Sequence, residues 1–185
     1  MRLFRTRRGL LLVAASALAI AAGCSMQIQP TIFPPPVPAT LRPGEDQVVY
    51  LEALATGVQI YECVPKSDPA GAFEWVFRAP EANLVDKEGK PIGRHYGGPT
   101  WEANDGSKVI GEVKARDPGP TPSAIPWLLL NAKSTWGKGI FADTRSILRA
   151  KTTGGLAPNQ PCDAASARQM ARVPYTATYY FYRGA

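Results

Sequence analysis

Short runs in which apolar and polar residues alternate recur along most of this chain, and they restrict what it can fold into. In Lys108–Ala115, Val109 and Val113 fall on one face of an extended segment and Glu112 falls on the other. A two-residue period places successive side chains on opposite faces of a strand, whereas a helix needs a period of 3.6. Tyr175–Tyr182 alternates in the same way, so the pattern predicts β-structure up to the end of the chain.

Turn signals separate these runs at near-regular intervals. Asn104–Gly106 and Asp86–Gly89 contain residues that tolerate tight turns, and Thr56–Gly57 predicts a hairpin turn. We expect about nine short strands, for which the sequence offers ten candidate runs. The candidates are Val48–Leu54, Val58–Cys63, Phe73–Phe77, Ala82–Val85, Ile92–Tyr96, Thr100–Ala103, Lys108–Ala115, Trp127–Leu130, Ser146–Lys151 and Tyr175–Tyr182.

One short C-terminal helix is expected over Asp163–Arg172. Asp163 can cap it, its alanines and arginines favour it, and Pro174 stops it. Many short strands with one helix predict a mainly β fold, a single antiparallel β-sandwich or barrel-like domain. The pattern does not choose between these two architectures.

The N-terminus has the features of an export signal. Four arginines precede an apolar run, Leu10–Gly23, and Cys24 follows it. This order is typical of a secretory signal peptide, and a cysteine after small residues resembles a bacterial lipobox, in which the thiol is lipidated. We expect residues 1–23 to be removed and Cys24 to anchor an outer-membrane lipoprotein facing the periplasm. The alternatives are ordinary cleavage to a soluble periplasmic or secreted product, twin-arginine export, and an uncleaved anchor. The last conflicts with a run shorter than the roughly 20 residues of a membrane span.

Composition divides the remainder into two parts. Residues 24–46 contain a cluster of prolines, which favours an extended tether. Residues 47–185 are expected to form one β domain. Its two cysteines, Cys63 and Cys162, indicate a disulfide in an oxidising compartment. A metal or redox pair is the alternative, but neither cysteine belongs to a C-x-x-C motif and the chain has one histidine.

Charge excludes some classes of partner. The formal net charge is +6, but four arginines are removed with the signal peptide. The remaining chain then has 17 basic and 15 acidic residues. A small net charge, with scattered basic residues, gives no support for binding nucleic acid. The expected membrane contact is the N-terminal lipid. The oligomeric state cannot be predicted from these features.

The segment Gly93–Val113 is densest in polar and aromatic side chains. His95, the sole histidine, could act as a general base beside Glu102, Asp105 or Asp117, or could have a structural role. Tryptophan on a β-sheet can stack on sugar rings or bind a partner. The candidate binding surface comprises His95, Tyr96, Trp101, Glu102, Asn104 and Asp105.

No catalytic motif accompanies this segment. The G-x-S-x-G nucleophile elbow and the G-x-G-x-x-G dinucleotide fingerprint are missing from the sequence. Asn104–Gly106 lacks the spacing of a calcium loop. We therefore expect no metal and no cofactor.

Four strings in the chain resemble an uncharacterised family. They are Val58–Cys63, Gly93–Ser107, Ile125–Leu130 and Val173–Tyr182. They are similar to domain-of-unknown-function family 3455, exported proteins of bacteria and fungi, and the resemblance covers roughly Pro38–Tyr182. It implies a secreted single domain with no established activity, so it assigns no catalytic residue.

Two functional hypotheses follow. The first is a lipid-anchored cell-envelope protein whose β domain is a binding or structural module for an envelope ligand or carbohydrate. The second is a small periplasmic hydrolase or lyase that uses His95 as general base.

Overall fold

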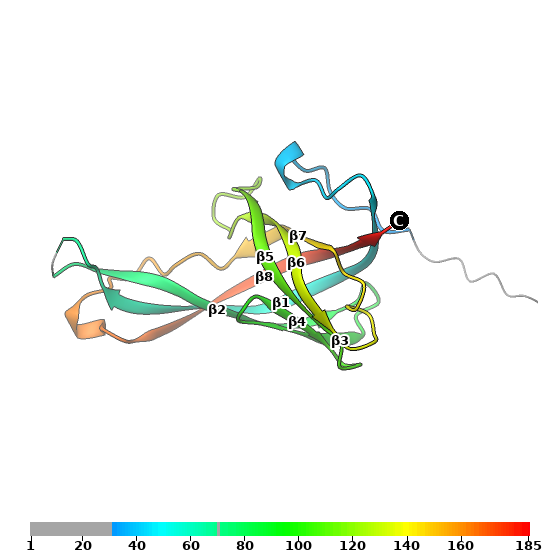
Figure 1. Cartoon of the computed structure of the whole chain (residues 1–185). Helices are drawn as coiled ribbons and strands as arrows, with labels where there is room; N and C mark the ends of the chain where they lie inside the picture. Colours follow the sequence, from blue (N-terminus) through cyan, green and yellow to red (C-terminus); the bar gives the residue numbers. More distant parts are fainter. Residues whose placement is uncertain (1–30, 70) are drawn as a thin grey trace, which may run out of the picture. The chain divides into compact units, whose positions relative to one another are not determined.

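Among the residues that the computed structural model describes, 31–69 and 71–185, eight antiparallel strands form the body of the protein (Figure 1). The expected signal peptide, Cys24 and the first part of the expected tether lie outside these residues. The strands are β1 (Gln47–Pro65), β2 (Phe73–Val85), β3 (Pro91–Tyr96), β4 (Thr100–Ala103), β5 (Lys108–Asp117), β6 (Trp127–Trp136), β7 (Ser146–Gly154) and β8 (Met170–Gly184).

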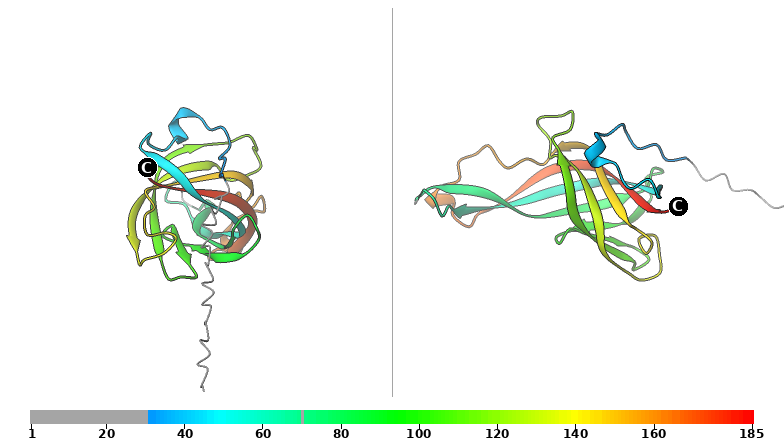
Figure 2. Two further views of the ribbon diagram at one scale, coloured as in Figure 1. Left: turned by 90° about the vertical axis from the view of Figure 1, so that its right-hand side faces the viewer. Right: turned by 45° about the horizontal axis from the view of Figure 1, so that its top comes forward.

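The strands belong to one sheet, in which each pairs with its neighbours along the chain. β1 pairs with β2 on one side and with β8 on the other, so the strand order closes on itself. In the left view of Figure 2 the strands surround a common interior. The prediction of a mainly β, antiparallel domain is confirmed, and the described strands form a single sheet rather than the two packed sheets of a sandwich.

The hairpin predicted at Thr56–Gly57 is wrong, because β1 runs through it as one strand of 19 residues. Gly57 does not form a turn; it allows β1 and β2 to approach each other closely. A Cβ atom at this position would overlap the backbone of Glu81 and Ala82 on β2. Glycine inside a strand often marks such a contact. The two short runs predicted over residues 73–85 likewise belong to one strand, β2.

The helix predicted over Asp163–Arg172 is also wrong. Only a 3-10 turn, η2 (Ala164–Ser166), forms there, although Asp163 caps it as expected by accepting from the Ser166 backbone N–H. The following residues extend instead, and Met170–Arg172 pair with β1. Strand pairing therefore overrides the local helix preference. No helix in the described part of the chain is long and apolar enough to cross a membrane.

Alternation along the strands produces two apolar clusters, one on each face of the sheet. The interior cluster includes Trp101, Leu130, Ile147, Tyr179 and Phe181. The outer cluster lies on β6, β7 and β8, where Leu41 from η1 (Ala39–Leu41) is fully buried with Ile32 and Val37 beside it. Residues 32–41, placed in the tether by their composition, therefore pack against the domain.

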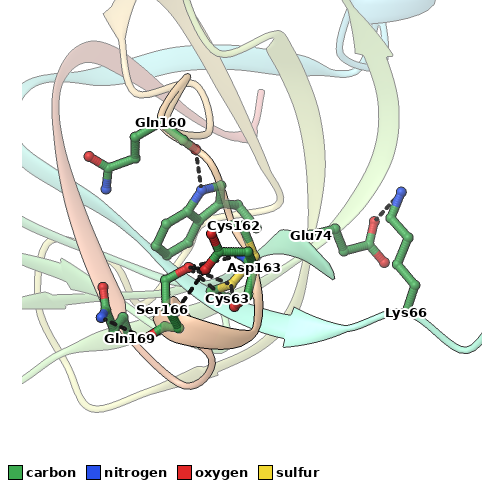
Figure 3. Close-up of a disulfide and its surroundings, with 10 residues drawn as sticks. Cys63, Lys66, Glu74, Gln160, Cys162, Asp163, Ser166 and Gln169 are labelled. Atoms are coloured by element: carbon green, nitrogen blue, oxygen red, sulfur yellow. Dashed lines mark hydrogen bonds and ion pairs between the residues drawn. A yellow bond between two sulfur atoms is a disulfide. The ribbon is translucent and has the colours of Figure 1, made fainter. Parts of the chain in front are cut away.

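The far ends of β1, β2 and β8 continue beyond the other strands as a three-stranded arm (Figure 1), formed by residues 58–65, 73–81 and 170–174. The loop between β7 and β8 is attached to this arm. Cys162 on the loop forms a disulfide with Cys63 on β1, with 5.6 Å between the two Cα atoms (Figure 3). The predicted disulfide is thus confirmed.

Candidate functional site

Strand alternation separates the six residues of the predicted binding surface. His95 on β3 and Trp101 on β4 are cross-strand partners, and both side chains are buried in the interior of the sheet. Glu102 and Tyr96 come from the opposite face of the same two strands. Consecutive residues of a strand point to opposite faces, so one contiguous surface cannot include both sets.

His95 is held in the interior by aromatic rings and one backbone carbonyl. Its ring stacks on the Trp101 ring, with 4.3 Å between the centroids. It packs edge-on against the Tyr179 ring, with 5.1 Å between the centroids. Nδ1 lies 2.8 Å from the Thr100 carbonyl oxygen. Because a carbonyl only accepts, Nδ1 carries the hydrogen and Nε2 carries the lone pair.

This environment keeps His95 neutral. Burial lowers the pKa of His95 to about 3, against the opposing effect of the hydrogen bond to Thr100, and the positive charge of Arg149 lowers it further. A general base that works with a carboxylate needs that group within hydrogen-bond reach. The hydrogen-bond partner of the His95 ring is a backbone carbonyl, and Glu102 is turned away from it. The geometry does not support the acid–base role.

Glu102 belongs to an ion-pair cluster on the outer face. Arg94 Nη2 lies 2.8 Å from the Glu102 carboxylate and Lys108 Nζ lies 3.2 Å from it. The Tyr96 hydroxyl donates to the same carboxylate at 2.9 Å. The hydrogen bonds from Arg94, Tyr96 and Lys108 lower the pKa of Glu102 to about 2. A carboxylate held this firmly in its ionised form joins β3, β4 and β5 and is a poor proton donor.

Asn104 and Asp105 form the turn that joins β4 and β5. Asn104 Nδ2 donates to the Pro91 carbonyl at 3.0 Å. The Asp105 carboxylate accepts from the backbone N–H of Ser107 at 2.8 Å and from that of Ile140 at 2.9 Å. Asp105 therefore holds the loop between β6 and β7 against this turn. The described residues contain no group of three or more side chains arranged to bind a metal ion.

A cavity of about 420 Å³ opens into the interior beside His95 and Trp101. Its size lies in the range of roughly 300–1,000 Å³ that small-molecule sites have. Most of its wall is apolar, with Val113, Leu130 and Ile125 among the lining residues. The arm contributes Tyr61 and Phe77, whose rings pack edge to face with 5.7 Å between their centroids.

Three buried polar atoms belong to side chains that line this cavity, and none of them makes a hydrogen bond of standard geometry in the described chain, although Tyr175 lies near Gln59 and Tyr179, and Arg149 lies near Tyr179. The three atoms are Gln59 Nε2, Trp101 Nε1 and Tyr179 Oη, on side chains that are 2 %, 1 % and 1 % exposed. An indole N–H and an amide N–H can only donate. Leaving such a group buried and unpaired costs about 1–3 kcal/mol. Each of the three atoms has less than 1 Å² of accessible surface, so a bound molecule with acceptor atoms would remove this cost only where its entry shifts the side chains that cover them.

Arg149 on β7 brings a positive charge to the same cavity. It lies across from Leu128 on β6 and Tyr179 on β8. Its Nε and Nη2 atoms donate to the Pro126 carbonyl at 3.1 and 2.8 Å. The sequence pattern alone does not single out Arg149, Gln59 or Tyr179 as site residues. The available signal was the alternation within Ser146–Lys151, which places Arg149 on the same face as the apolar Ile147.

Comparison with known proteins identifies one family. Searches of curated proteins and of solved structures gave no match. A family of proteins of unknown function, DUF3455, matches residues 43–183. This range contains β1 to β7, all of β8 except its last residue, the disulfide and every residue named at the cavity. The chain therefore belongs to the DUF3455 family.

Proposed function

We propose that this protein is a binding module of the bacterial cell envelope, which holds a small and mainly apolar molecule in the cavity beside His95 and Trp101. The observation that carries the proposal is the combination of an apolar cavity with buried donors that make no hydrogen bond of standard geometry in the described chain. An enclosed apolar wall provides affinity, and a few fixed polar groups orient the ligand.

The site differs from the surface that the sequence predicts. His95 and Trp101 remain in it, because they line the cavity. Glu102, Tyr96 and Asp105 are occupied by contacts that join strands and loops. In this proposal they support the walls and do not touch the ligand.

The cellular part of the proposal rests on the N-terminal sequence and on the disulfide. An apolar run after four arginines, followed by Cys24, supports export and lipid anchoring at the outer membrane. The disulfide between Cys63 and Cys162 suits an oxidising compartment such as the periplasm. Mass spectrometry of the protein purified from membranes tests this part. A mature chain that begins with an acylated Cys24 is expected, and an intact chain of 185 residues would contradict it.

Binding is tested with a neutral fluorescent probe, N-phenyl-1-naphthylamine, and the full-length protein. We expect saturable binding with about one site per chain. Val113→Phe places a larger side chain in the cavity wall and should weaken binding about tenfold or more, because the probe and the ring compete for the same space.

The matched control is Val48→Phe, which adds the same ring at an exposed position outside the cavity. It should bind the probe as the unsubstituted protein does. Absence of probe binding, or equal binding by the Val113 and Val48 variants when both unfold at the same temperature, would rule out the cavity as the site.

A further inference from the structure

The position of Arg149 indicates the charge of the ligand, which the apolar wall of the cavity does not. The residue occupies an inward-facing position of β7, is half-buried and lines the cavity. The Pro126 carbonyl accepts from two of its nitrogen atoms. A guanidinium has five N–H donors in a planar fork, so several are left over for another acceptor.

No carboxylate of the described residues neutralises this charge. Seven ion pairs occur in the described chain, and Arg149 takes part in none of them. The residues that line the cavity include Arg78, Arg116 and Arg149 but no aspartate or glutamate. Arg78 is paired with Glu62 at 2.7 Å, and Arg116 is exposed. Arg149 is therefore the unpaired cation farthest from solvent at this site, and a partly desolvated charge favours an anionic partner.

The neutral polar groups of the lining residues also favour a ligand that accepts hydrogen bonds. Trp101 Nε1 and Gln59 Nε2 are donors, and the Tyr179 hydroxyl can donate. A ligand head group rich in acceptors can pair with those of them that it reaches, whereas an ammonium or another pure donor would leave them unpaired. A carboxylate has about four acceptor positions and the planar geometry that a guanidinium matches.

Building on the proposed function, we infer that the cavity takes an amphipathic carboxylic acid, with its carboxylate at Arg149 and its apolar body against Val113, Leu128 and Leu130. The body is apolar because these lining side chains offer no polar group. The class includes medium-chain fatty acids and apolar aromatic or alicyclic acids.

A competition experiment tests the ligand class on the full-length protein. Bound N-phenyl-1-naphthylamine is displaced by decanoate, decan-1-ol or decyltrimethylammonium, three ligands with the same chain and different head groups. Decanoate should displace the probe at a concentration about tenfold lower than decanol, because charge-assisted hydrogen bonds are stronger than neutral ones. The cation should be the weakest competitor.

The outcomes separate the two proposals. Equal displacement by the acid and the alcohol, better displacement by the cation, or probe binding that none of the three affects would overturn the carboxylate inference. Each of these results would leave the cavity as a binding site. A protein that does not bind the probe at all would overturn both.

Substitution of Arg149 assigns the preference to one residue. Arg149→Met should remove most of the difference between decanoate and decanol, and Arg149→Lys should keep part of it because the charge remains. Arg172→Met is the control, since Arg172 pairs with Glu81 outside this cavity, and it should keep the full preference. An unchanged preference in the Arg149→Met protein would contradict the assignment. If that variant does not fold, the three-ligand comparison on the unsubstituted protein still decides the inference.

Discussion

His95 shows how burial decides the chemistry of a residue. Alone in the sequence, it is the natural candidate for acid–base work, because its ordinary pKa is near neutrality. In the structure it is stacked on Trp101 and bonded to the Thr100 carbonyl, and its pKa is about 3. His95 is therefore an uncharged residue in the cavity wall across the physiological pH range.

This burial makes a prediction for stability against pH. Unfolded His95 binds a proton below about pH 6.5, while the folded residue resists protonation down to about pH 3. Between these values the unfolded state binds more protons, so the free energy of unfolding should fall as the pH falls. The contribution of one such group is about 1.4 kcal/mol per pH unit.

His95→Asn isolates this effect, because the asparagine amide can still donate to the Thr100 carbonyl and does not titrate. Urea unfolding at several pH values between 4 and 6.5 should give a shallower slope for the variant than for the unsubstituted protein. Identical slopes would mean that His95 is protonated in the folded protein at these pH values.

At the scale of single elements, the sequence predicts strand positions better than strand lengths. The candidates from Ile92 to Ala115 match β3, β4 and β5 closely, since turns with glycine separate them. The sequence predicts two strands in place of β1, because Gly57 carries the local signature of a turn, whereas its actual role depends on the distant backbone of β2. The predicted helix failed in the same way, because its second half pairs with β1. Local patterns do not contain these long-range contacts.

Gly57 also makes a prediction for stability. Gly57→Ala places a Cβ atom against the Glu81 carbonyl and Ala82, so one of the two strands must shift. Overpacking of this kind costs about 1–3 kcal/mol, and the melting temperature should fall by several degrees. Gly97→Ala is the control, because its Cβ would lie 3.3 Å from the Ala79 side chain, a contact that a small movement relieves. Equal melting temperatures for the two variants, measured by circular dichroism, would argue against the close approach.

At the scale of the whole molecule, the closed strand order creates the candidate site. Gln59 on β1, Trp101 on β4, Arg149 on β7 and Tyr179 on β8 are far apart in the chain and line one cavity. The sequence points to His95 and Trp101 as individual residues, because they belong to a dense polar and aromatic segment. It cannot predict the cavity, since that requires the order in which all the strands pair.

The central claim is that a ligand enters this cavity and lies beside Trp101, which lines it. The most direct measurement is the nuclear magnetic resonance spectrum of the tryptophan indole N–H groups during titration with decanoate, with Trp101 assigned through Trp101→Phe. We predict a large saturable shift for Trp101 and little change for Trp136, whose side chain is 50 % exposed and does not line the cavity. A titration that moves Trp136 and leaves Trp101 unchanged would contradict the account.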